Sequence, residues 1–99
     1  MGLSLEARTA LRRIRADVLD GHWMQGDYHS EDGSHHCLVG FIYLQPDHIQ
    51  DEVKTALAKM INPASPVHRQ TLVVGWNDRK GRTKEEVVAL IDRTLKGPS

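Results

Sequence analysis

The side chains best suited to chemistry gather in one polar segment of the 99-residue chain, residues 22–37. Its candidate metal ligands are four histidines and the only cysteine: His22, His29, His35, His36 and Cys37. Zinc prefers imidazole and thiolate ligands in a tetrahedral set of four, so the segment holds suitable ligand types. Their spacing matches no recognised pattern of paired ligands, and a histidine-rich polar segment is more often only a loop. We therefore expect no cofactor and keep a metal site as an alternative hypothesis.

Cys37 is also a candidate nucleophile. If a helix begins at Ser34, the sulfur lies in its first turn, where the partial positive charge of a helix N-terminus lowers the pKa of a thiol. His68 and Asn77 then follow in the chain order of the catalytic groups of cysteine proteases. That chemistry requires an imidazole within hydrogen-bond distance of the sulfur and an amide that orients it. Because a buried cysteine more often packs as a small apolar residue, the sequence favours a protein without catalytic activity.

Basic residues concentrate in the last third of the chain. Four of them cluster around one turn, with a fifth upstream: Arg79, Lys80, Arg82 and Lys84, and Arg69. Such side chains neutralise phosphates. Two glutamates follow directly, and the formal net charge of the chain is zero, whereas nucleic-acid-binding domains usually carry a basic excess. Nucleic acid is therefore not the expected partner, and weak binding through residues 79–84 is a second alternative.

Three features bear on where the protein resides. A single cysteine cannot form an internal disulfide, so the fold does not depend on an oxidising compartment. Residues 1–6 lack the basic-then-apolar layout of a secretory signal. The longest apolar run, 37–44, is interrupted by Gly40 and is too short to cross a membrane. We expect a cytoplasmic protein that does not engage a membrane.

Apolar residues recur at helical spacing in three segments, which predict helices over about residues 4–20, 47–61 and 83–96. Ser4 is a suitable N-cap for the first helix. The start of each of the other two carries a capping-box pattern. The pairs are Asp47 with Gln50 and Thr83 with Glu86.

Two shorter segments decide the fold class. The run 37–44 fits a buried strand or a buried helix, and we favour a helix capped by Ser34 because Gln45-Pro46 closes the run. Residues 71–76 are β-like, and residues 77–81 have the composition of a turn. The sequence thus predicts a mainly α fold, a compact bundle of about four helices with one short extended segment near 71–76. The alternative is an α+β fold with a small sheet from 37–44 and 71–76. Residues 1–96 should form a single domain, and 97–99 a short tail.

Two sequence elements resemble those of a known family. Residues 33–40 resemble its G-x-x-x-C-L-x-G element, and residues 76–87 resemble its W-N-D-x-x-x-R-T-x-x-E-V element. Trp23 matches a tryptophan upstream of the cysteine. The family comprises small proteins or domains of actinobacteria and their phages and has no known function. The resemblance covers about residues 20–95, implies a helix near Ser34 and implies no activity. The chain departs from the pattern at Phe41, where the family often has a small residue.

The same elements also have a purely structural interpretation. Trp76 can anchor in the core, and Asn77 and Asp78 can bond nearby backbone amides before a capped helix begins. We therefore predict a small intracellular binding or regulatory protein that acts through protein–protein contacts. The arginine face of the first helix, or the acidic segment 21–62, could meet an unidentified protein partner, and a second copy of the chain is one candidate. The alternative is a metal-binding or thiol-dependent site around Cys37 and the histidine-rich segment.

Overall fold

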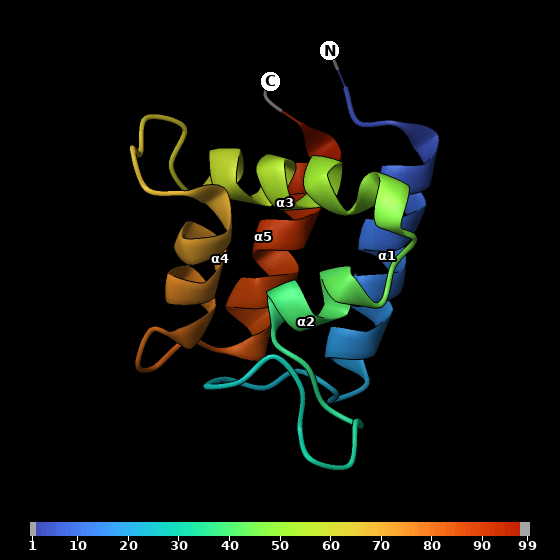
Figure 1. The fold of residues 1–99 in the computed structure, drawn as a ribbon, viewed down its shortest axis with the longest axis vertical. Helices are drawn as coiled ribbons and strands as arrows, with labels where there is room; N and C mark the ends of the chain where they lie inside the picture. The colour runs from blue at the N-terminus through green and yellow to red at the C-terminus, as the bar shows by residue number, and fades with distance from the viewer. Residues whose placement is uncertain (1, 98–99) are drawn as a thin grey trace.

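A computed structural model describes residues 2–97 of the chain, and within them it contains five α-helices and no sheet (Figure 1). The helices are α1 (Leu5–Leu19), α2 (Leu38–Tyr43), α3 (Asp47–Ile61), α4 (Arg69–Asp78) and α5 (Lys84–Lys96). The predicted mainly α class is confirmed, with one helix more than expected. None of the described helices is long and apolar enough to span a bilayer. The tail predicted at 97–99 lies, beyond Gly97, outside the described residues.

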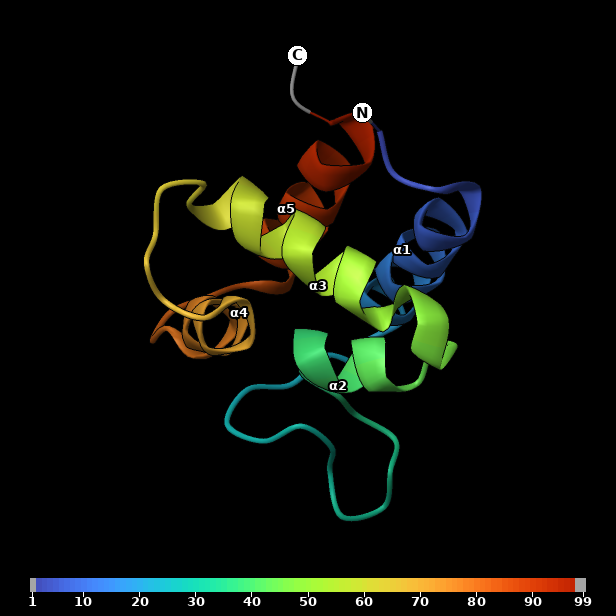
Figure 2. The ribbon, with the colours of Figure 1, turned by 45° about the horizontal axis from the view of Figure 1, so that its top comes forward.

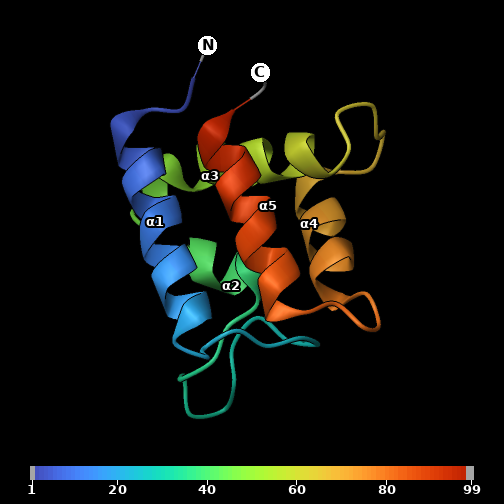
Figure 3. The same cartoon turned by 180° about the vertical axis from the view of Figure 1, so that it is seen from behind.

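The helices enclose one core. Helices α1 and α5 lie side by side, α3 crosses over both, and α4 packs against α3 and α2 (Figures 1 and 2). Helices α1, α3 and α5 bury apolar side chains at helical spacing, whereas α2 is buried along five consecutive residues, 38–42. The largest fully buried members of the core are Phe41, Leu11, Ile14, Leu38, Ile42, Leu57, Leu90 and Ile91. The loop between α1 and α2, residues 20–37, lies at the end of the molecule opposite the start of α1 and the end of α5 (Figure 3).

Two of the predicted helix starts are confirmed in detail. The Ser4 hydroxyl accepts a hydrogen bond from the amide of Ala7, which caps α1. Thr83 and Glu86 form a capping box in which each side chain accepts from the other's backbone amide. The predicted box at the start of α3 is wrong. Pro46 is the N-cap there, and Gln50 instead donates to the carbonyl of Gln45 at 2.9 Å.

The extended segment predicted at 71–76 is also wrong, because these residues form the middle of α4. Local β-propensity yields to packing, since helical spacing buries Val73 and Asn77 on one face and leaves Gly75 exposed. Asn77 and Asp78, expected in a turn, are the last two residues of the helix. The alternative α+β fold is therefore not observed within residues 2–97.

The helix predicted from Ser34 begins later, because Cys37 is the N-cap of α2. Isolated bridges pair His36 with Trp23 and with His29, which holds the preceding residues extended. The Ser34 hydroxyl bonds within its own loop instead of capping a helix. The start of α2 is thus set by tertiary pairing rather than by the best local capping residue.

Candidate functional site

The Asn77 side chain ties the α1–α2 loop to the end of α4. Asn77 is fully buried, and its Oδ1 accepts hydrogen bonds from Trp23 Nε1 at 2.7 Å and from the amide of Leu38 at 3.1 Å. Its Nδ2 donates to the Met24 carbonyl at 3.2 Å and to Asp78 Oδ1 at 2.9 Å. One amide therefore joins the loop, α2 and α4.

The neighbouring residues extend this junction. The Asp78 carboxylate accepts from the amide of Gly26 at 3.0 Å, and Gln25 Nε2 donates to the carbonyls of Asn77 and Arg79. Residues 25 and 26 are thus fixed against the C-terminal end of α4. These contacts support the structural interpretation of the W-N-D element.

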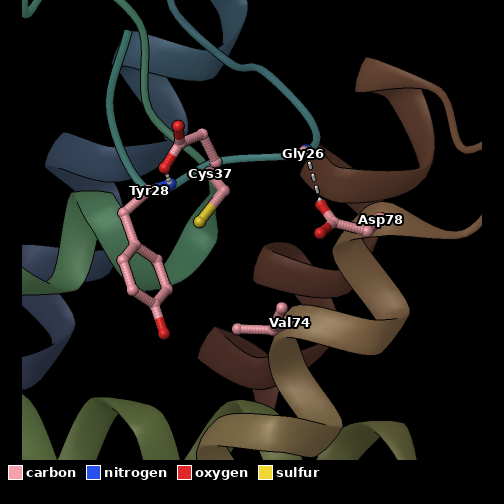
Figure 4. A pocket seen from close by; sticks show the side chains of 6 residues that line it. Gly26, Tyr28, Cys37, Val74 and Asp78 are labelled. Atoms are coloured by element: carbon pink, nitrogen blue, oxygen red, sulfur yellow. Dashed lines mark hydrogen bonds between the residues drawn. The ribbon is translucent and has the colours of Figure 1, made fainter.

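A pocket of about 170 Å³ lies between the loop and α4 (Figure 4). We call it the α4 pocket. It is lined by Gly26, Asp27, Tyr28, Cys37, Val74 and Asp78. The Cys37 sulfur points toward the space between the Tyr28 ring, Val74 and Asp78 (Figure 4). The pocket therefore has apolar walls and carboxylates at its edge.

A side-chain network holds the Tyr28 wall in place. Gln70, one helical turn before Val74, donates to the Tyr28 hydroxyl at 3.1 Å. Its Oε1 accepts from the Tyr43 hydroxyl at 3.0 Å and from Lys54 Nζ at 2.9 Å. Lys54 is buried and also faces the Tyr43 ring. The wall is thereby connected to α2, α3 and α4, so it is organised before any ligand arrives.

The three residues of the hypothetical thiol mechanism are not brought together. Asn77 lies beside Cys37, because it accepts from the amide of Leu38. His68, however, is the N-cap of α4, while Asn77 is near the other end of that helix. At 1.5 Å per residue, the two are separated by about 13 Å along the helix axis. An imidazole at His68 therefore cannot activate the sulfur in this arrangement.

The pKa of the Cys37 thiol is raised above its ordinary value, opposite to the direction expected at a helix N-terminus. Burial is the main cause, and the Asp78 charge adds to it, while the amide of Gly40 opposes it by donating to the sulfur. At neutral pH the group is an uncharged thiol, which is a poor nucleophile.

Cys37 should consequently be protected from alkylation in the folded protein. We expect iodoacetamide at pH 7.5 to modify it at least about 100-fold more slowly than in the urea-unfolded chain, because the reactive thiolate is scarce and only 2% of the residue is exposed. Mass spectrometry over time measures the two rates. Similar rates in the folded and unfolded chain would restore the thiol-dependent hypothesis.

The candidate metal ligands are distributed among separate contacts. His29 Nδ1 and His36 Nδ1 lie 2.7 Å apart, while His22 Nδ1 lies 2.9 Å from the Ser34 carbonyl. His35 contacts the Ser34 hydroxyl. Within residues 2–97, no three histidine, cysteine or acidic side chains gather as a metal site would require.

Two of the five basic side chains considered for phosphate binding, Arg82 and Arg69, are engaged within the fold. Arg82 lies over the Trp76 ring at 3.8 Å, donates to the Trp76 carbonyl and pairs with Glu86, so only 9% of its side chain is exposed. Arg69 pairs with Asp51. The second alternative, weak nucleic-acid binding through residues 79–84, would therefore depend on Arg79, Lys80 and Lys84.

These features define a small, mainly helical domain in which the α1–α2 loop and the C-terminal half of α4 line a pocket. The model of a family of unknown function (DUF6197) matches residues 4–96, and the chain belongs to this family. The resemblance seen in the sequence is thus confirmed and extends into α1. The searches of curated proteins and of solved structures found no match to the chain.

Sequence reasoning missed most of the pocket. The sequence does not single out Tyr28 or Val74, and it indicates Asp78 only as a turn residue that bonds nearby backbone amides within the W-N-D element. The available signal was the spacing of Gln70, Val74 and Asp78 at intervals of four, which places them on one face of a helix. That signal could be used only after residues 69–78 were assigned to a helix.

Proposed function

We propose that the domain is a small binding protein that acts through protein–protein contacts, and that the α4 pocket accepts a lysine or arginine side chain of its partner. The observation that carries this proposal is a pair of carboxylates, Asp27 and Asp78, at an apolar-walled pocket. Among the described residues, neither carboxylate forms an ion pair.

The size of the pocket favours a side chain over a metabolite. Pockets for small molecules usually enclose about 300–1,000 Å³, whereas an engineered cavity of about 150 Å³ holds one benzene. At about 170 Å³, the α4 pocket has room for one side chain. Such an anchor side chain inserts into a pocket and contributes most of the binding free energy, while the contacts around it contribute little.

The chemistry of the pocket favours a long cationic side chain. Lysine and arginine bury an aliphatic stem while they keep the charged end near solvent or an acid. The Tyr28 ring and Val74 offer an apolar surface for the stem, and Asp78 offers a counter-ion (Figure 4). The raised pKa of Cys37, to which Asp78 contributes, is consistent with a negative field inside the pocket.

The surface beside the pocket has the composition of an interface. Tyr28 is 38% exposed and Tyr43 is 40% exposed, and their rings pack edge to face at 5.7 Å. Tyrosine is enriched at protein interfaces because it presents a large apolar area together with a polar tip. The two rings can therefore extend the contact around an anchored side chain.

A peptide-display selection tests the proposal. Peptides selected on the wild-type domain should be enriched in lysine or arginine, and Val74→Trp, which fills the pocket, should raise their Kd at least about tenfold. The matched control is Leu5→Trp, an addition on the exposed face of α1 that should leave the Kd unchanged. Both variants are first checked for wild-type melting. A selection that yields only peptides insensitive to Val74→Trp would overturn the proposal.

A further inference from the structure

The α1–α2 loop is closed by two histidines that share one hydrogen bond. His29 Nδ1 and His36 Nδ1 lie 2.7 Å apart, and the rings meet edge to face with centroids 5.0 Å apart. A neutral imidazole has one donor and one acceptor nitrogen, whereas a charged imidazolium has two donors. The bond therefore exists only while at least one ring is neutral. A second proton places two N–H groups and two positive charges against each other.

We infer that this pair makes the α4 pocket acid-sensitive: protonation of both rings opens the α1–α2 loop and releases the bound side chain. The release of a ligand rests on the proposed function, whereas the opening of the loop is a property of the free protein.

The pair lies next to the wall of the pocket. His29 directly follows Tyr28, whose ring lines the pocket and whose carbonyl accepts from the amide of Cys37 at 3.2 Å. The backbone of His36 is bonded on both sides, because its amide donates to His22 and its carbonyl accepts from Met24. Separation of the two rings thus pulls on both the Tyr28 segment and the strand-like segment that leads into α2.

The surroundings oppose a charge on His36. The residue is 9% exposed, and burial is the first cause that lowers its pKa below the ordinary 6.5, followed by the positive charge of His29. From the same loop, His22 and His35 also lower it, while Asp17 of α1 raises it. From α2, the uncharged ring of Phe41 lies against His36, with the two ring centroids 5.1 Å apart.

The sign of the pH effect follows from this lowered pKa. An opened loop exposes His36 and returns its pKa toward 6.5, so the open form binds protons more readily than the closed form. Closure is therefore favoured most above pH 6.5 and weakens as the pH falls below that value. The pKa of the Asp32 carboxyl is lowered by hydrogen bonds from Ser34 and Ser30. This carboxylate therefore stays ionised as the pH falls through 6.5 and does not contribute to the opening.

His29→Asn separates this mechanism from general acid destabilisation. The asparagine Oδ1, attached to Cγ like the histidine Nδ1, can accept from a protonated His36 but does not itself titrate. The variant should therefore keep the loop closed to a lower pH than the wild type does, because burial still opposes a charge on His36 but a charge on residue 29 no longer does. The matched control is His48→Asn, which replaces a histidine of α3 that pairs with Glu6 of α1 and makes no contact with the His29–His36 pair.

Amide hydrogen exchange and peptide binding test the inference at pH 7.5 and 5.0. In the free wild-type protein and in His48→Asn, the protection factors of the His36 and Cys37 amides should fall at least about tenfold on acidification. The fall should be at least about threefold smaller in His29→Asn, where burial still opposes a charge on His36 but residue 29 no longer does. A histidine-free peptide from the display selection should lose affinity in parallel. Equal loss of protection in wild type and His29→Asn would overturn the inference, whatever the fate of the peptide.

Two further readouts keep the outcomes separate. Loss of protection without loss of peptide affinity would overturn the release step while leaving the binding pocket intact. His29→Asn cannot be used if it melts at a lower temperature than wild type at pH 7.5. In that case the test is a titration of the wild-type protein that follows the ring nitrogens of His29 and His36. Two separated protonation steps support the shared bond, and two independent titrations at ordinary pKa values overturn it.

Discussion

Gly40→Ala is expected to lower the free energy of unfolding by about 3 kcal/mol or more, or to prevent folding. A Cβ at this position would lie 2.0 Å from the Tyr28 carbonyl oxygen and 2.9 Å from the Tyr28 carbonyl carbon. Both are backbone atoms, so no rotamer change can relieve the overlap. The α1–α2 loop would have to move away from α2, and with it the wall of the α4 pocket. Urea unfolding followed by tryptophan fluorescence measures the loss.

The control for this prediction is another helical glycine. Gly75 lies exposed in α4, and a Cβ there would meet nothing within 4 Å. Gly75→Ala should therefore stabilise the protein by about 0.5–1 kcal/mol through helix propensity alone. A Gly40→Ala protein as stable as wild type would show that the loop does not rest on α2 as described.

Asn77→Ala is expected to cost about 3 kcal/mol or more, because truncation leaves several buried polar groups without partners at about 1–3 kcal/mol each. The affected groups include Trp23 Nε1, the Leu38 amide and the Met24 carbonyl. The same unfolding measurement applies, and the emission of Trp23 should shift toward longer wavelength as its indole is released.

The matched control is Asn62→Ala, at the exposed end of α3. Its Oδ1 accepts only from the nearby amide of Ala64, at 3.1 Å. This change should cost less than about 1 kcal/mol. If Asn77→Ala were equally mild, the amide would not be the junction between loop, α2 and α4, and the W-N-D element would need another explanation.

The helices predicted most accurately from sequence were those with local signals. The termini of α1, α3 and α5 agree with their apolar periods to within a residue or so. At Ser4 and Thr83 the caps are also made by the residues that the sequence indicated, because a cap depends on atoms within four residues. The predicted start of α2 at Ser34 is wrong because His36 pairs with residues 22–29, and no local sequence pattern reveals this pairing.

The site was harder to predict than the fold. Its wall, floor and counter-ion come from three separated segments, represented by Tyr28, Cys37 and Asp78. Only a correct assignment of α4 places Val74 and Asp78 on one face, and the β-branched run at 73–74 concealed that helix. The family resemblance pointed to Cys37 and Asp78 as separate motif residues, but not to a pocket between them.

The most direct test of a cation-accepting pocket is a nuclear magnetic resonance titration of the ¹⁵N-labelled domain with two short peptides. One peptide carries a lysine between glycines, and the other carries norleucine, which has the same stem without the charge. At low salt, the lysine peptide should shift the amides of Gly26, Tyr28 and Asp78 and bind at least about tenfold more tightly than the norleucine peptide. Asp78→Asn, which keeps an oxygen for the Gly26 amide but leaves only the Asp27 carboxylate, should reduce the difference, whereas Glu85→Gln on α5 should not. Equal binding of the two peptides, or shifts confined to another face, would contradict the proposed pocket.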